Sequence, residues 1–265
     1  MLANNNKAIS NKLAKNSVKT NKKQYAILFF TIILSAFMLF CVFTIGMTYL
    51  DSSRLQNTRL NGAEYDIATM NGFTSEQLNT LRQNEHIRSV GMESYAGFIQ
   101  STEYDETVEV GLLWCDEVFW DNLMSPARTK LDGHYPQNKN ELMVTKDILK
   151  TCGNENLSVG DSLILTYENN TGVYTDEFII SGIWDGYGDR SAGFVSKAFY
   201  DETGYDLKND GILCIKLNRN YVFPATIQSI EKSLDFSDRQ IFAPTGYIEN
   251  SFKLLLGICG LALVI

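Results

Sequence analysis

The sequence predicts an α+β protein in which a transmembrane helix is followed by a large outer domain and by the start of a second transmembrane helix. Three observations predict it. An uncharged apolar run covers residues 25–50, strand-like and helix-like segments alternate over residues 51–249, and a second apolar run covers residues 254–265. We expect the outer domain to have two lobes, a sheet-and-helix lobe of βαβ type and a small β-rich lobe inserted at about residues 137–190.

The first apolar run is long enough to cross a membrane. As a helix that rises about 1.5 Å per residue, residues 25–50 reach roughly 39 Å, more than the roughly 30 Å hydrocarbon core of a bilayer. A cleaved signal peptide is the alternative, but its apolar region usually has only about 7–15 residues and ends in small residues. The sequence around Asp51 is a poor cleavage site, so we expect a retained anchor.

Charge predicts how this helix is oriented. Six lysines lie in residues 1–24, whereas the first acidic residue of the chain is Asp51. Basic segments stay on the cytoplasmic side of a membrane. We therefore expect residues 1–24 to be cytoplasmic and residues 51–249 to lie outside the plasma membrane of a bacterial cell.

The second apolar run has about 12 residues after Lys253 and would reach about 18 Å, which is too short to cross a bilayer. It shows no polar face of the kind that a helix on a protein core would have. We expect a second span to begin near Asn250, with residues 250–265 as its start, and the chain to be the N-terminal piece of a longer membrane protein. An amphiphilic C-terminal helix is the alternative.

Composition excludes several functions for the outer domain. Residues 51–249 hold all 31 acidic residues but only 16 of the 23 basic ones, so nucleic acid and anionic lipid surfaces would repel this domain. The charge can favour cationic ligands or simply keep the domain soluble. Three outer cysteines, Cys115, Cys152 and Cys214, and only two histidines in the chain indicate neither a disulfide scaffold nor a zinc site. We expect no metal and no cofactor.

The outer domain begins with a helical stalk. Residues 51–61 are polar but compatible with a helix, so we expect the membrane helix to continue and to end near Gly62. A strand is expected at residues 65–70. Thr74 and Gln77 have the spacing of a capping box and predict the start of the next helix.

The following segments predict two strands and a helix. Residues 87–99 and 107–114 are rich in β-branched and apolar side chains, and residues 116–123 fit a helix that ends before Pro126. Residues 131–136 are rich in turn formers and are expected to break the pattern.

The inserted lobe is expected to hold a hairpin. A strand at residues 141–145 leads into a short helix that ends by Gly153. Residues 162–167 alternate in polarity toward a turn at residues 169–172, and residues 177–184 then form the partner strand.

The last part of the outer domain is expected to belong again to the sheet-and-helix lobe. Ser196 follows a short strand at residues 194–195 and is a good N-cap for a helix that ends at Gly204. Residues 211–217 are a clear strand, and a helix at residues 224–234 begins with a proline, which suits its first position.

The motifs of common enzymes are absent. The sequence has no phosphate-binding loop, no G-x-S-x-G and no H-E-x-x-H. Residues 206–217 match a calcium loop poorly, because Leu217 stands where glutamate is needed. The glycine-rich loop at residues 185–190 could bind a ligand, although a solvated loop is the simpler interpretation. The three tryptophans could line a groove, although core packing is the simpler interpretation. We expect the chain not to be an enzyme.

The order of these parts resembles the permease subunits of ABC transporters of the MacB and FtsX type. The resemblance covers the whole chain and rests on five segments in order: residues 11–19, which are similar to the amphipathic segment before the first span, and residues 61–66, 140–144, 159–165 and 178–183. The family positions that match are structural ones: Gly62, Asn140, Glu141, Gly160, Asp161 and Gly182.

The resemblance implies partners and a mechanism. Such permeases pair with a separate ATP-binding ABC subunit and with a second permease copy or a related permease, and their outer domains move through stalk helices. It implies a peptide, lipid or lipoprotein substrate without choosing among them. A two-span membrane sensor with a ligand-binding outer domain is the alternative, because it has the same topology up to Ile265.

Overall fold

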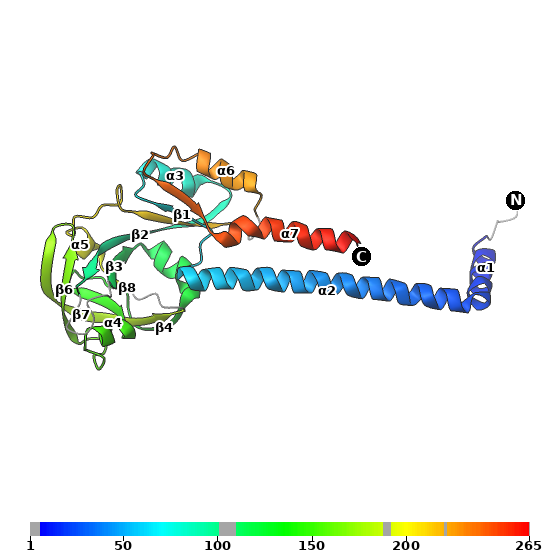
Figure 1. Cartoon of the computed structure of the whole chain (residues 1–265), viewed down its shortest axis with the longest axis horizontal. Coiled ribbons are helices and arrows are strands. Elements are labelled where there is room, and N and C mark those ends of the chain that lie inside the picture. The colour runs from blue at the N-terminus through cyan, green and yellow to red at the C-terminus, as the bar shows by residue number, and fades with distance from the viewer. Residues whose placement is uncertain (1–5, 101–109, 188–191, 220–221, 265) are drawn as a thin grey trace. The chain divides into compact units, whose positions relative to one another are not determined.

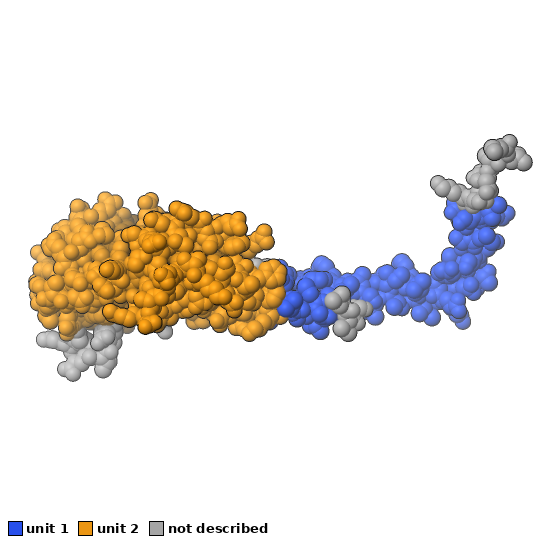
Figure 2. Space-filling view, turned by 90° about the horizontal axis from the view of Figure 1, so that it is seen from above, with its two compact units in different colours: residues 1–50, 254–265 blue, residues 51–253 orange. Residues whose placement is uncertain are grey.

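The computed structural model describes residues 6–100, 110–187, 192–219 and 222–264. The chain forms two compact units (Figure 2). One consists of residues 1–50 and 254–265, and the other of residues 51–253. We call the second of these the outer unit.

The first unit is helical. It holds α1 (Asn6–Thr20), the apolar part of α2 (Lys22–Asn61) and the end of α7 (Gly246–Val264). Within the described residues, α2 alone is long and apolar enough to cross a membrane, with a mean hydropathy of 2.8 over its most apolar window. Gly46 in α2 lies against Ile258 in α7, where an added Cβ would come within 2.6 Å of the Ile258 side chain. A small residue at this position lets the two apolar helices approach closely.

The outer unit is built on one ten-stranded sheet. The order of strands is β10-β1-β9-β2-β3-β8-β5-β7-β4, and β6 pairs with both β2 and β7. The pairs β3–β8 and β5–β7 are parallel, and the other pairs are antiparallel. The strands are β1 (Ile67–Met70), β2 (Ile87–Ile99), β3 (Val110–Cys115), β4 (Arg128–Gly133), β5 (Glu141–Thr145), β6 (Ser162–Asn169), β7 (Gly172–Gly186), β8 (Ala192–Val195), β9 (Ile212–Leu217) and β10 (Ile241–Pro244).

Short helices cover this sheet. They are α3 (Ser75–Gln83), α4 (Lys146–Thr151), α5 (Lys197–Tyr200) and α6 (Pro224–Lys232). Helices α3 and α6 lie on the same side of β1 (Figure 1) and bury Leu81, Ile227 and Ile230 in one apolar cluster with β1, β2 and β9. Two further apolar clusters lie around β5–β7 and around β3 and β8. The fold is therefore α+β, as the sequence predicts.

Several predicted elements are found close to their expected limits. Strand β2 has the predicted bounds, and α3 begins with the predicted capping box. The Gln77 backbone N–H donates to Thr74 Oγ1 at 3.1 Å, and the Thr74 N–H donates to Gln77 Oε1 at 2.9 Å. Helix α2 ends at Asn61, next to the predicted end of the stalk. Residues 107–109 of one predicted strand lie outside the described residues.

Other elements differ from the predictions. Residues 128–133 form β4 and not only turns, and β10 was not predicted. The helix expected at residues 116–123 is a short π-helix, Val118–Leu123. Asp116 determines its start, because its carboxylate accepts hydrogen bonds from the N–H groups of Phe119 at 2.8 Å and Met92 at 2.9 Å. The strands of residues 137–190 join the same sheet as the rest of the outer unit, and the limits of an inserted lobe stay a prediction.

Candidate functional site

The stalk part of α2 ends in a sharp turn into the sheet. Gly62 follows the last helical residue and has a φ of +68°, the left-handed conformation that ends many helices and that glycine adopts without strain. The chain then passes Glu64 and Asp66 and enters β1 at Ile67. The end of the stalk is thus only a few residues from β1, the second strand from one edge of the sheet.

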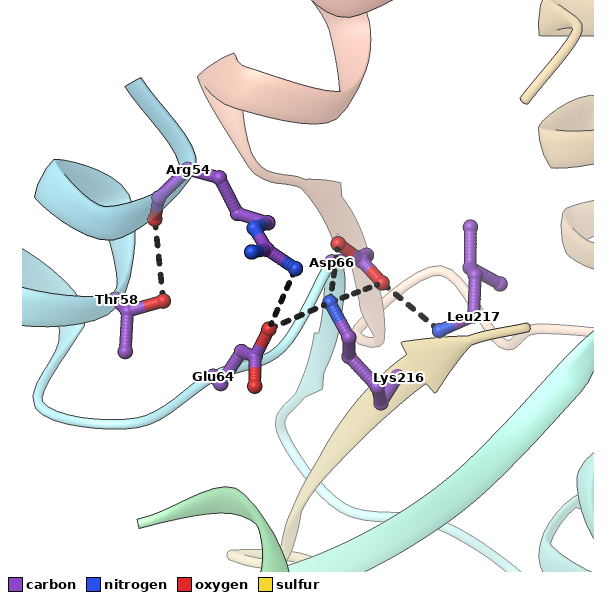
Figure 3. A network of polar contacts seen from close by, with 6 residues as sticks. All are labelled: Arg54, Thr58, Glu64, Asp66, Lys216 and Leu217. Carbon is purple, nitrogen blue, oxygen red and sulfur yellow. Dashed lines mark hydrogen bonds and ion pairs between the residues drawn. The ribbon is translucent and has the colours of Figure 1, made fainter. Parts of the chain in front are cut away.

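A buried lysine joins this turn to β9. Lys216 Nζ lies 3.3 Å from Asp66 Oδ2 and 3.3 Å from Glu64 Oε1, and the side chains of Lys216 and Asp66 are only 7% and 2% exposed (Figure 3). Asp66 Oδ2 also accepts a hydrogen bond of 2.8 Å from the Leu217 N–H. We call Arg54, Glu64, Asp66 and Lys216 the stalk joint.

The backbone of Asp66 strengthens the joint. Its N–H donates to the carbonyl of Ile215 at 2.8 Å, and its carbonyl accepts from the N–H of Thr245 at 2.8 Å. One residue therefore connects β1, β9 and the start of α7. Removal of any of these partners would leave a buried polar group unsatisfied, which costs about 1–3 kcal/mol.

Arg54 ties the stalk helix itself to the joint. Its Nη1 lies 3.7 Å from Glu64 Oε1, so Glu64 stands between Arg54 of the stalk and Lys216 of the sheet (Figure 3). The Glu64 N–H also donates to the carbonyl of Leu123 at 2.6 Å. Arg59, one turn further along α2, lies with its guanidinium carbon 4.2 Å from the ring centre of Tyr187. The stalk is thus held to the sheet at two points.

Burial dominates the electrostatics of Asp66. Desolvation raises the pKa of its carboxyl above the ordinary value, although the charge of Lys216 and the hydrogen bond from Leu217 lower the pKa. Attraction of Lys216 for two carboxylates stabilises the arrangement only while all partners are present, because an unpaired charge in such a site is costly. The stalk joint is therefore a specific connection with one geometry.

The six positions predicted from the family resemblance fall into two places. Gly62 lies at the end of the stalk. The other five meet at the middle of β7: the Ile179 N–H donates to the Asn140 carbonyl at 2.8 Å, and the Gly160 N–H donates to the Ile180 carbonyl at 2.8 Å. The Ile180 N–H donates to the Asp161 carbonyl at 2.9 Å, and Glu141 pairs with Ile179.

Glu141, Asp161 and Gly182 have structural roles in this cluster. The Glu141 carboxylate accepts from the Gln137 N–H at 2.7 Å and from Asn138. Desolvation raises the pKa of this carboxyl, but the hydrogen bonds from Gln137 and Asn138 together outweigh it and hold the pKa below its ordinary value. Asp161 accepts from the Ser158 N–H at 2.8 Å. A Cβ at Gly182 would come within 2.7 Å of Met143 and 2.9 Å of the His134 carbonyl, so a side chain at this position would have to displace both neighbours.

Other candidate positions are part of the core. The three tryptophans are buried, and Trp120 and Trp184 pack on Phe194. Asp185 and Gly186 belong to β7, while residues 188–190 of that predicted loop lie outside the described residues. Among the residues that the structure describes, no group of three or more His, Cys, Asp or Glu side chains could hold a metal ion.

The structure restricts which cysteines a thiol reagent can reach. Cys115 and Cys214 are buried and Cys152 is half-buried. These native cysteines are therefore poor reporters of the side of the membrane on which the outer unit lies. A cysteine placed at an exposed position such as Glu155 is required.

The joint was not predicted from the sequence, although one signal was present. Lys216 is a charged residue inside the otherwise apolar strand at residues 211–217. A buried lysine in a strand usually has a carboxylate partner. The sequence alone does not identify Asp66, which lies far away in the chain.

These features define a class of protein, namely one with a mixed α+β domain whose first strand follows a long helix that is apolar over most of its length.

No protein-family model matches the sequence, and no curated protein is significantly similar to it. Solved structures to which the chain is similar include the periplasmic region of MacB from Actinobacillus actinomycetemcomitans, with a TM-score of 0.47, 12% identity, and coverage of 73% of this chain and 95% of that chain.

Two other solved structures are similar at a comparable level. A domain of a putative permease protein from Porphyromonas gingivalis has a TM-score of 0.42 and 11% identity, and the match covers 73% of this chain and 95% of that chain. The extracellular domain of the noncanonic ABC-type transporter YknZ from Gram-positive bacteria has a TM-score of 0.43 and 12% identity, with coverage of 67% and 98%.

The first prediction concerns the charge of Lys216. We expect Lys216→Met to lower the free energy of unfolding of the outer unit by about 3–5 kcal/mol, because Asp66 and Glu64 would lose their buried partner. Urea unfolding of the full chain in detergent, followed by tryptophan fluorescence, measures it, since all three tryptophans lie in the outer unit.

The matched control is Lys139→Met. Lys139 pairs with Glu202 at 2.5 Å, but both side chains are more than half exposed. An exposed pair contributes only about 0–1 kcal/mol. Equal losses for the two variants would contradict the role assigned to Lys216.

The second prediction concerns pH. Because the folded protein binds the proton of Asp66 more tightly than the unfolded chain does, this carboxyl makes the outer unit less stable as pH rises from about 4 through its raised pKa. We expect the stability of the wild type, relative to Asp66→Asn, to fall over this pH range. Urea unfolding of both proteins across the range tests it, and a difference that does not change with pH would refute it.

The third prediction concerns the β7 cluster. We expect Gly182→Ala to destabilise the outer unit by about 1–3 kcal/mol, because the new methyl group must displace Met143 and the backbone at His134. Gly246→Ala is the control, since a Cβ there meets nothing within 4 Å. Thermal unfolding of both variants makes the comparison. A Gly182→Ala protein as stable as the control would show that β7 tolerates a side chain at this position.

Proposed function

We propose that the chain is a permease subunit of an ATP-driven ABC transporter, anchored in the bacterial plasma membrane by α2. The observation that carries the proposal is the course of α2, which is one helix from Lys22 to Asn61 and includes both the apolar segment and the stalk. A helix that continues without interruption from the membrane segment into the stalk is suited to transmit displacement. The resemblance of the sequence to MacB and FtsX type permeases supports the same function.

In this proposal the stalk joint is the point where force reaches the outer domain. ATP binding and hydrolysis occur on a separate ATP-binding subunit, which pairs with this permease and with a second permease copy or a relative. Movement of α2 passes through Arg54 and Glu64 to Lys216 and thus to β9 of the sheet. The chain itself supplies no covalent chemistry, and its substrate is a peptide, a lipid or a lipoprotein.

We also propose the orientation of the chain. Residues 1–24 lie in the cytoplasm and the outer unit lies outside the membrane, because the lysines precede the span and every acidic residue follows it. The sensor alternative shares this orientation. The basic segment before α2 favours the permease over the sensor, because a sensor usually has only a few residues before its first span.

The fourth prediction tests the orientation. In a protein whose native cysteines are replaced by alanine, Glu155→Cys should react in intact cells with a thiol reagent that does not cross membranes. Lys12→Cys should react only after the membrane is opened. Both side chains are exposed, so accessibility depends on the side of the membrane. The reverse pattern would overturn the proposed topology.

A separate experiment tests the class. The full protein, affinity-purified in detergent from the membranes of its own cells, should bring with it a subunit that carries a phosphate-binding loop and hydrolyses ATP. Association instead with a kinase or a methyl-accepting partner would favour the sensor. Lys139→Met, a surface change, serves as a control that leaves the association intact.

A further inference from the structure

Two phenylalanines form an exposed corner of the outer unit. Phe223, directly before α6, is 65% exposed, and its ring lies 5.0 Å from the ring of Phe252 in α7, centre to centre. Phe252 is only partly exposed. Phe223 is the most exposed aromatic side chain among the described residues of the outer unit.

The place of Phe252 along α7 is informative. Lys253 and then an apolar run beginning at Leu254 follow it in the same helix. At about 1.5 Å per residue, Phe252 lies only about 3 Å along the helix axis from that run. Aromatic side chains gather where a membrane helix leaves the bilayer, and lysine side chains reach to the headgroups there.

A groove lies beside these rings. It has a volume of about 480 Å³, and α6, β10 and α7 contribute apolar side chains to it, among them Pro224, Ile227 and Phe242. Glu231, Glu249 and Lys253 line it as well. Sites for small ligands have volumes of about 300–1,000 Å³ and combine an apolar lining with a few polar groups. The groove therefore fits an amphiphile with an apolar chain and a charged head.

We propose that this corner, made of Phe223, Phe252, Lys253 and the groove, rests on the outer surface of the bilayer and takes up part of a zwitterionic lipid. This inference rests on the proposed function and on the expectation from the sequence that a second span begins near Asn250, because it needs α7 to enter the membrane after Lys253. The apolar chain of the lipid fills the groove, and its phosphate faces Lys253. The carboxylates of Glu231 and Glu249 favour a lipid that also carries a positive group over an anionic one.

The consequence is that the outer unit has a second attachment to the bilayer beside the stalk. The stalk joint fixes the sheet to α2, and the corner holds α6 and the start of α7 at the headgroups. Movement of the outer unit then requires the corner to slide along or leave the lipid surface.

The experiment places a fluorescent label on single cysteines in the full chain and measures quenching by lipids. The native Cys41, Cys152 and Cys259 are first replaced by alanine, because Cys115 and Cys214 are buried. The label is put at Gln228, which is exposed and lines the groove, at Leu34 in the apolar part of α2, and at Glu155 as a control on the outer unit. Each protein is placed in nanodiscs of phosphatidylcholine with a spin label on the headgroup or on the acyl chain.

The expected result is that headgroup-labelled lipid removes most of the fluorescence at Gln228 and little at Glu155, and that Phe223→Ser reduces the quenching at Gln228. Acyl-labelled lipid should quench Leu34 strongly in every variant. If Leu34 is quenched but Gln228 is quenched no more than Glu155, the proposed contact of the corner with lipid is refuted, whereas the proposal that α2 anchors the chain in the membrane is not. If Leu34 is not quenched, the proposed anchor fails, and this inference fails with it.

Discussion

The arrangement of the outer unit depends on one buried charge. Lys216 lies near the end of β9, between the apolar residues Ile215 and Leu217, and among the described residues its ion pairs are with Asp66 and Glu64, beside the end of the stalk. Because a buried ammonium without partners is costly, the folded sheet and the folded stalk turn require each other. This mutual requirement gives the connection between α2 and the sheet a single geometry, which neither an apolar contact nor a flexible loop would impose.

The joint also explains how the fold can serve a mechanical role. Asp66 connects β1, β9 and the start of α7, so a displacement of the stalk reaches several strands at once. The cluster at the middle of β7 fixes the other half of the sheet through backbone bonds and through Gly182, where a side chain would have to displace its neighbours. The outer unit therefore holds its shape at both ends of a long sheet, which is what a domain moved as a body needs. The proposed lipid corner adds a contact that such a movement would have to change.

The sequence predicts the local elements better than the connections between them. Strand β2, the capping box of α3 and the end of α2 follow from apolar patterns and cap residues close to each other in the chain. Strand β4 was missed because its residues are mostly exposed and polar, and it is a strand only through pairing with β7. The stalk joint was missed for the same kind of reason, since Lys216 and Asp66 are brought together by β1 and β9 from opposite ends of the outer unit.

The central claim is that the stalk and the sheet are one rigid body. The most direct test is the distance between spin labels at Gln56, exposed on the stalk, and Glu155, exposed beyond α4, in the full protein, measured with and without ATP and the ATP-binding subunit. The account predicts one narrow distance distribution that ATP does not change. A broad distribution, or one that shifts with ATP, would show that the joint bends and would contradict the account.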